Sequence, residues 1–221
     1  MITLHHCPQT RSMRVLWLLN ELDIEFSLVR HLFDKSLRSP EHLSRSPAGR
    51  VPALEMDGET YFESGAIIEI LCERFSERGL GRLMGDLDRP DWLVWLHFAE
   101  TVSQHCAALT QQHVAIYDDA MRSPTVMKLE AARLKKCYTA IEGRLSTPVE
   151  NRDYLLTSGF SAADIAVGQA VYLGQFFARL DEFPETAKWY ERLTERPAFQ
   201  ASLPDDGSGI YAKDFYPAWE V

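Results

Sequence analysis

Apolar and polar positions in the first eighty residues follow first the two-residue period of a strand and then the longer period of a helix. Residues 2–7 and 26–32 are short strand-like runs. Between them, apolar residues from Val15 to Leu22 recur at i, i+3, i+4 and i+7, the spacing of one helix face. The pattern predicts a strand, a helix that begins near Ser12 and a second strand, in the order of a parallel β-α-β unit.

The next stretch predicts a hairpin followed by a helix. A polar run at residues 34–49 has no apolar period and is expected to be irregular. The runs VPALEM and TYF then flank Asp57-Gly58, a dipeptide typical of hairpin turns. Helical spacing returns from Ser64 onward, so a helix should cover the hairpin.

Strand patterns disappear in the second part of the chain. The change falls within GLGRLMGDLDRP, which predicts a domain boundary between Gly79 and Pro90. The fold class is therefore an α/β domain at residues 1–80 followed by an all-α domain at residues 88–221. Within the second domain the spacing predicts helices at residues 91–114, 124–145, 162–179 and 186–195.

Two details of the second domain concern packing rather than chemistry. Ser161 and Asp164 have the spacing of a helix capping box, with Asp in place of the usual Glu or Gln. Because each aromatic ring can bury about 150–250 Å², the tail beyond Pro204 is expected to pack, either as a cover for this domain or as a wall of a substrate pocket. Its aromatic residues are Tyr211, Phe215, Tyr216 and Trp219.

Composition narrows the class of protein. The chain has 221 residues, of which 46% are hydrophobic and 25% charged, as in ordinary globular proteins. Its formal charge of -9 argues against nucleic acid, whose phosphates are bound by clustered Lys and Arg. No apolar run approaches the about 20 residues of a membrane span, and the N-terminus lacks the pattern of a signal peptide. We expect a cytoplasmic protein without nucleic-acid or membrane partners.

The spacing of cysteine and histidine shows no metal-binding motif. The four cysteines lie far apart in the sequence, which is typical of reduced thiols rather than of disulfides or zinc ligands. His5 and His6 are adjacent on a predicted strand, so their side chains should point to opposite faces and cannot bind one ion together. We therefore expect no metal site.

Residues 50–64 hold the most informative pattern. Pro52 heads a strand-like run, where proline is tolerable if its peptide bond is cis. Val51 would then offer its backbone N–H and C=O to an extended peptide. At the next helix start, the hydroxyl of Ser64 and unsatisfied N–H groups suit a carboxylate, and Glu63 suits an ammonium group. These groups indicate a receptor for an α-amino acid head group, and a plain hairpin with a capped helix is the alternative.

This pattern resembles that of the cytosolic glutathione transferases of bacterial type. The resemblance covers essentially the whole chain and rests on P-x-G-x-V-P-A-L, then D-G, then E-S-x-A-I, between residues 47 and 67. It implies a thioredoxin-like N-terminal domain and an all-helical C-terminal domain, with glutathione as co-substrate and no metal.

The resemblance also assigns roles to six residues around glutathione. It implies that Val51 pairs its backbone with the cysteinyl part of glutathione beside a cis Pro52, and that Glu63 and Ser64 hold the γ-glutamyl group. Near the glycine carboxylate, where plant and bacterial members often place binding residues, stand Arg50 and His42.

The group that activates the glutathione thiol is expected in HHCPQTRSMR, residues 5–14. Family members place a Ser, Tyr or Cys just after the first strand, and many have Ser where this chain has Gln9. We therefore expect Thr10 to donate a hydrogen bond to the sulfur, with Ser12 second and the Gln9 amide third. Both hydroxyls lie near a helix start, whose dipole favours a thiolate. Cys7 falls inside the strand and is expected to be a buried structural thiol.

In the implied reaction a glutathione thiolate attacks a largely apolar electrophile, and the implied biological role is detoxification. A free thiol has a pKa of about 8.5, so the site must stabilise the thiolate. The resemblance further implies a homodimer, for whose interface Ile68 and Cys72 are candidates. Two alternatives stay open: a glutathione-dependent disulfide reductase or peroxidase, and a non-catalytic glutathione- or ligand-binding or regulatory protein of the same fold.

Overall fold

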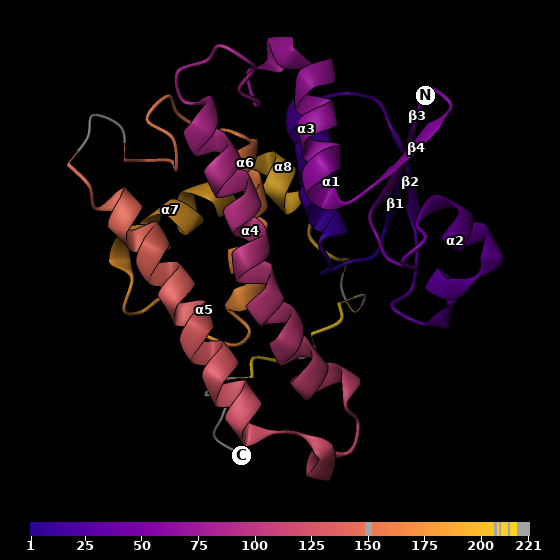
Figure 1. The fold of residues 1–221 in the computed structure, drawn as a ribbon, viewed down its shortest axis with the longest axis vertical. Helices are drawn as coiled ribbons and strands as arrows, with labels where there is room; N and C mark the ends of the chain where they lie inside the picture. The colour runs from indigo at the N-terminus through magenta and orange to yellow at the C-terminus, as the bar shows by residue number, and fades with distance from the viewer. Residues whose placement is uncertain (149–151, 206, 208, 212, 216–221) are drawn as a thin grey trace. The chain divides into compact units, whose positions relative to one another are not determined.

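The computed structural model describes residues 1–148, 152–205, 207, 209–211 and 213–215 (Figure 1). The chain forms two compact units. The first comprises residues 1–85 together with 195–210, and the second comprises residues 86–194 together with 211–221.

The first unit contains a four-stranded sheet in the order β2-β1-β3-β4. β1 is parallel to β2 and antiparallel to β3, which is antiparallel to β4, so the predicted β-α-β unit and hairpin are confirmed. The elements of this unit are β1 (Ile2–His6), α1 (Ser12–Leu22), β2 (Ser27–Arg30), η1 (Lys35–Arg38), α2 (Pro40–Arg45), β3 (Ala53–Met56), β4 (Glu59–Phe62), α3 (Ser64–Arg74), η2 (Ser76–Arg78) and α8 (Pro197–Gln200).

Helix α1 forms the centre of the packing in this unit. It contacts β1, α3 and α8, and Figure 1 shows α1 and α3 side by side. The ring of Trp17 meets that of Phe199 edge to face at 4.9 Å. Arg196 clamps Glu21 through two hydrogen bonds of 2.6 and 2.7 Å, so α8 is fixed to α1 by both apolar and ionic contacts.

The sequence pattern predicted that the polar run at residues 34–49 is irregular. This prediction is wrong, because the run contains η1 and α2. The side chain of Ser39 accepts a hydrogen bond from the backbone N–H of His42, and Pro40 occupies the first turn of α2. Serine at the cap followed by proline is a regular helix-start signal. The run was missed because a helix of six residues is too short to display an apolar period.

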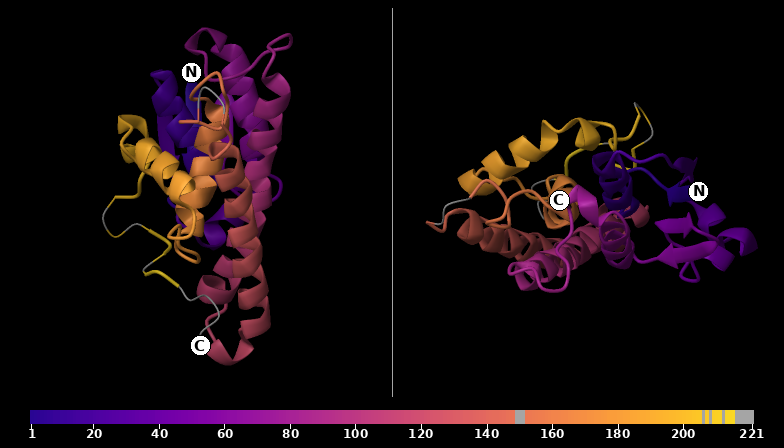
Figure 2. Two further views of the ribbon diagram at one scale, coloured as in Figure 1. Left: turned by 90° about the vertical axis from the view of Figure 1, so that its left-hand side faces the viewer. Right: turned by 90° about the horizontal axis from the view of Figure 1, so that it is seen from above.

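All the regular elements in the described part of the second unit are helices or helical turns. Helix α4 packs against α5 and α6, and α4 and α5 run side by side in both Figure 1 and Figure 2. The elements of the second unit are α4 (Arg89–Thr110), the π-helical turn η3 (Gln111–Ala115), η4 (Asp119–Met121), α5 (Pro124–Leu145), α6 (Ala162–Gly174) and α7 (Pro184–Thr194).

Helix α6 lies in the core of the second unit and begins with the predicted capping box. Ser161 accepts from the backbone N–H of Ala163, and the Asp164 carboxylate accepts from the backbone N–H of Ser161. Asp164 also accepts from the backbone N–H of Leu155 and from the indole N–H of Trp189. Burial raises the pKa of Asp164, while these donors oppose the rise. The pair therefore ties three segments together and has a folding role, as expected.

Two aromatic residues of the tail, Tyr211 and Phe215, pack on the second unit, as predicted, whereas residues 205–210 belong to the first unit. The ring of Tyr211 stacks on Phe176 at 4.8 Å, and its hydroxyl lies 2.8 Å from Oγ1 of Thr110. Phe215 stacks on Phe177 at 5.6 Å. The other two aromatic residues of the tail, Tyr216 and Trp219, lie outside the described residues.

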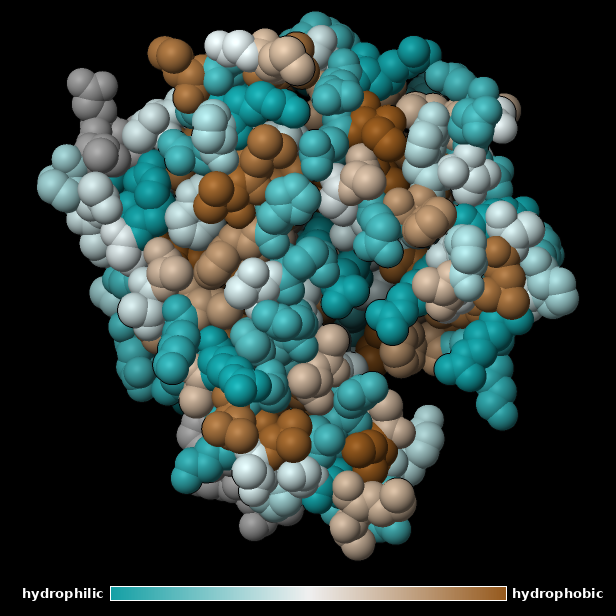
Figure 3. Space-filling view, in the orientation of Figure 1, coloured by the Kyte–Doolittle hydropathy of each residue, from teal (hydrophilic) through white to brown (hydrophobic). Residues whose placement is uncertain are grey.

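Apolar side chains make up most of the buried core of the described residues. On the face drawn in Figure 3, apolar side chains form small groups among polar ones. None of the described helices combines the length and apolar character needed to cross a bilayer. Ile68 and Cys72 are buried inside the first unit, with 0% and 1% exposure. They are therefore wrong as candidates for a subunit interface.

Candidate functional site

Three loops of the first unit meet at one end of its sheet. In the strand register, His5 lies opposite Ala53, and Ala53 lies opposite Phe62. The end of β1, the beginning of β3 and the end of β4 are therefore neighbours. The loops that adjoin these strand ends are residues 7–11, 50–52 and 63–64. Seven of the nine predicted site residues lie in these loops, and Ser12 directly follows the first loop. We call this place the sheet-end site.

The hydroxyl groups of Thr10 and Ser12 form one hydrogen-bonded network beyond β1. Thr10 Oγ1 donates to the Cys7 carbonyl over 2.8 Å and lies 2.7 Å from Ser12 Oγ. Ser12 Oγ lies 2.8 Å from His6 Nδ1 and accepts from the Cys7 backbone N–H over 3.1 Å. Ser12 is fully buried, whereas Thr10 is half-buried. Ser12 is therefore held inside the network, with Thr10 at its outer edge.

His6 closes the inner end of this network. Burial lowers the pKa of His6 to about 4, and the positive charge of Arg30 contributes in the same direction. The imidazole is therefore neutral at pH 7, with one ring nitrogen protonated and the other free to accept. No local sequence pattern indicates the contact between His6 and Ser12, because it depends on how α1 packs against β1.

Gln9, the third candidate for thiol activation, has a left-handed backbone and a buried side chain. Its φ is +53°, a conformation that few residues other than glycine adopt. The backbone of Gly209 approaches it so closely that a Cβ at residue 209 would lie 2.7 Å from Gln9 Oε1. The amide therefore packs under the segment that follows α8.

Cys7 does not have the surroundings of a reactive thiol. Its side chain is 2% exposed, and burial raises the pKa of the Cys7 thiol to about 11. A thiol with such a pKa is almost entirely protonated at neutral pH, while reactive cysteines are thiolates in partly exposed sites. The prediction that Cys7 is buried is confirmed.

The second loop contains a cis peptide bond between Val51 and Pro52, as the resemblance implied. Val51 lies two residues before the first paired residue of β3, Ala53. The preceding residue, Arg50, has an exposed side chain and an anchored backbone. Its carbonyl accepts from His42 Nε2 over 2.9 Å, and its N–H donates to the Ser46 hydroxyl over 3.3 Å. His42 itself is 2% exposed, so it supports this loop from within.

The third loop leads into α3. Glu63 is exposed and has a φ of +72°, a strained value for a residue with a side chain. Ser64 is the first residue of the helix and is 4% exposed. Its hydroxyl accepts a hydrogen bond of 3.1 Å from Nη1 of Arg14, a buried residue of α1 that spacing arguments had not placed in the site.

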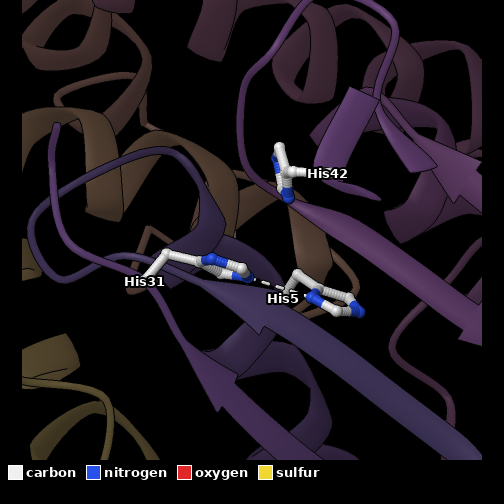
Figure 4. A group of neighbouring side chains, drawn as sticks. All are labelled: His5, His31 and His42. Atoms are coloured by element: carbon white, nitrogen blue, oxygen red, sulfur yellow. Dashed lines mark hydrogen bonds between the residues drawn. The ribbon is translucent and has the colours of Figure 1, made fainter. Parts of the chain in front are cut away.

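A cluster of three histidines lies beside the second loop. His5, His31 and His42 each bring one ring nitrogen within 4.8 Å of the other two (Figure 4). Burial lowers the pKa of His5, and a hydrogen bond to Glu55 opposes this. Burial likewise lowers the pKa of His31. The residues are 11 and 26 positions apart, so no local motif could have indicated the cluster.

Comparison with known proteins identifies both parts of the chain. Residues 4–79 match the family described as Glutathione S-transferase, N-terminal domain, and residues 106–197 match Glutathione S-transferase, C-terminal domain. Glutathione S-transferase 4 of Zea mays is 30% identical over 192 residues, which cover 84% of this chain and 83% of the maize protein.

Solved structures agree with the sequence comparisons. Glutathione transferase F7 of Populus trichocarpa is 26% identical with a TM-score of 0.80, covering 91% of this chain and 97% of its own. A sphingomonad glutathione S-transferase in complex with glutathione is 25% identical with a TM-score of 0.75, covering 91% and 96%. The predicted fold class, a thioredoxin-like domain followed by a helical domain, is confirmed. The chain belongs to the glutathione S-transferase family.

Proposed function

We propose that this protein transfers glutathione to a largely apolar electrophile by direct attack of the glutathione thiolate. The observation that carries the proposal is the convergence of three loops at the sheet-end site. One loop offers hydroxyl groups, one an extended backbone beside Pro52, and one a helix start with a serine. These are the three kinds of group that a γ-glutamyl-cysteinyl-glycine peptide requires.

The start of α3 suits the γ-glutamyl head group. Because the guanidinium of Arg14 can only donate, the Ser64 hydroxyl accepts from it and keeps its own hydrogen for a ligand carboxylate. The N–H groups of the first helical turn and the helix dipole add to the attraction for this carboxylate. The exposed Glu63 beside it offers a negative charge to the ligand ammonium group.

The second loop suits the remainder of the peptide. In the proposal, Val51 pairs its backbone with the cysteinyl residue, and the exposed guanidinium of Arg50 attracts the glycine carboxylate. His42 contributes by positioning the loop, because its ring is buried and bonded to the Arg50 carbonyl. In this proposal His42 therefore acts through the loop and does not contact glutathione itself.

Thr10 is the proposed donor to the glutathione sulfur. Its hydroxyl has a single hydrogen, which bonds the Cys7 carbonyl when no stronger acceptor is near. A thiolate is charged and therefore competes well for that hydrogen. A neutral His6 that carries its proton on Nδ1 donates to Ser12, and Ser12 can then donate to Thr10. In this order the Thr10 hydrogen can turn from the Cys7 carbonyl to the sulfur, and Ser12 has an orienting role.

A comparison of two reactions tests the proposal. The purified full chain is assayed with glutathione and an aryl halide such as 1-chloro-2,4-dinitrobenzene, and in parallel with a mixed disulfide of glutathione. Conjugation that is faster than disulfide reduction, and whose rate is lower in Thr10→Val, supports the proposed transferase activity. Disulfide reduction that exceeds conjugation would indicate the reductase, and retention on immobilised glutathione without either activity would indicate a non-catalytic binder.

A matched threonine separates the effect of the site from that of a lost hydroxyl. Thr139 is exposed on α5, and its hydroxyl donates along its own helix, to the Lys135 carbonyl. Thr139→Val should therefore leave both activities unchanged. If Thr139→Val and Thr10→Val lower conjugation equally, the role proposed for Thr10 is wrong.

A further inference from the structure

Three histidine rings converge in the first unit from three separate segments of the chain. His5 lies on β1, His31 follows the last residue of β2, and His42 lies in α2 (Figure 4). His5 Nδ1 and His31 Nε2 are 3.0 Å apart, and the ring centres of His31 and His42 are 4.9 Å apart. Neutral imidazole nitrogens in such numbers are typical ligands of transition metals.

In two of these rings, one nitrogen already has a hydrogen-bond acceptor as its partner. His5 Nε2 lies 3.1 Å from the Glu55 carboxylate, and His42 Nε2 lies 2.9 Å from the Arg50 carbonyl. Because both partners can only accept, each Nε2 carries the hydrogen and each Nδ1 carries a lone pair. Histidines that bind metals are oriented in this way, by a carboxylate or a carbonyl on the nitrogen opposite the ion.

The Nδ1 atom of His42 supplies a second, independent observation. This atom is buried and has no hydrogen-bond partner among the described residues. Leaving a buried acceptor without a partner is unfavourable, so such atoms in native proteins call for an explanation. A cation bound at this lone pair would provide one.

We propose that His5, His31 and His42 form a binding site for one divalent transition-metal ion of the Zn²⁺ class. The ligand atoms are Nδ1 of His5, Nε2 of His31 and Nδ1 of His42. Three protein ligands leave a fourth, open position, as in sites where zinc binds water or a substrate. All-nitrogen ligands disfavour Mg²⁺ and Ca²⁺, which prefer oxygen.

The observed geometry requires only small ring movements. In a tetrahedral site with Zn–N bonds of about 2.0–2.1 Å, neighbouring nitrogens lie about 3.3 Å apart. One separation here is 3.0 Å, and all three are within 4.8 Å. His31 is half-buried and lies outside the strand, so its ring has room to turn. Without an ion its Nε2–H donates to His5, and on binding that proton is lost or moves to Nδ1.

Zinc titration of the full chain, purified without a polyhistidine tag, tests the site. Competition with a chromophoric chelator gives stoichiometry and affinity, and Co²⁺ in place of Zn²⁺ reports a tetrahedral site by its strong visible absorption. We expect one equivalent per chain. His31→Gln should weaken binding at least about 100-fold and Glu55→Gln about 10-fold. His97→Gln, the same change at an exposed residue of α4, should have no effect.

Several results would overturn the proposal. These are the absence of saturable binding below about 100 μM Zn²⁺, equal affinity in the parent and His31→Gln, or an equal loss in His97→Gln. Thermal unfolding provides a second readout, because Zn²⁺ should raise Tm in the parent chain and not in His31→Gln if it binds only the folded site. Both readouts follow the metal and not glutathione, so the outcome is independent of the proposed transferase activity.

Discussion

Nη1 of Arg14 donates a hydrogen bond to Oγ of Ser64 over 3.1 Å, across 50 residues of sequence. Arg14 is 1% exposed and Ser64 is 4% exposed. A buried cation on α1 therefore orients the hydroxyl at the start of α3. This relationship supports the proposed role of the serine as a donor to an anionic ligand group.

Ser64→Ala should weaken glutathione binding. The change removes a hydrogen bond to a charged group, worth about 1.5–3 kcal/mol, which corresponds to a loss of affinity of about 10- to 150-fold. Calorimetric titration with glutathione measures it. Ser27→Ala, on the exposed side of β2, is the matched control and should bind as the parent does. Unchanged affinity in Ser64→Ala would show that the γ-glutamyl group binds elsewhere.

Thr10→Val should raise the pKa of the thiol in bound glutathione, because the thiolate loses a hydrogen bond. We expect a shift of about one unit, from an interaction of about 1–2 kcal/mol. Thiolate absorbance in the ultraviolet, followed against pH with glutathione bound, measures it. Ser12→Ala should mainly lower stability, since it leaves His6 Nδ1 and the Cys7 N–H without their partner. A larger pKa shift in Ser12→Ala than in Thr10→Val would reverse the two assignments.

Cys7→Ala should retain conjugation. The thiol is buried and its pKa is raised to about 11, so it supplies no nucleophile at neutral pH. Steady-state assays with the aryl halide measure this, with Cys137→Ala as the control for removing another buried thiol whose pKa is about 11. Loss of all activity in Cys7→Ala alone, with the chain still folded, would favour the reductase.

Glu130→Gln should destabilise the second unit at neutral pH but not in acid. Burial tends to raise the pKa of Glu130, but hydrogen bonds from His105 and Arg133 outweigh it and lower the pKa below its usual 4.5. Its stabilisation is complete above about pH 4.5 and is lost as the pH falls through the folded-state pKa. We expect a difference of about 1 kcal/mol at pH 7 that shrinks below pH 4.5.

Urea unfolding of parent and variant between pH 7 and pH 4 measures this difference. Glu77→Gln, a change at an exposed residue, should show little difference at any pH. A difference between parent and Glu130→Gln that stays constant to pH 4 would mean that the charge of Glu130 does not contribute.

A homodimer is expected from the family resemblance. Sedimentation at micromolar concentration should give twice the 25.2 kDa of one chain. Because Ile68 and Cys72 are buried, their substitution should affect folding and not association. A stable species of 25.2 kDa would contradict the expectation.

The order of the elements was predictable because periodicity depends only on local geometry. Alternation over residues 2–7 and helical spacing after Ser12 place apolar side chains on one face whatever they pack against. Helix α2 was missed for the opposite reason. It is too short for a period, and its only signals are the cap at Ser39 and the proline that follows.

The sequence by itself determined the two-part fold, the family motif around Val51 and Ser64, and the opposed directions of His5 and His6. All three follow from spacing along the chain. The rings of these two histidines contact His31 and Ser12 respectively. Only the tertiary structure decided which distant groups contact Ser64 and His5. Strand register and helix packing brought Arg14 to Ser64 and set His31 and His42 beside His5. Such contacts join residues tens of positions apart, and no local pattern encodes the energy of their packing.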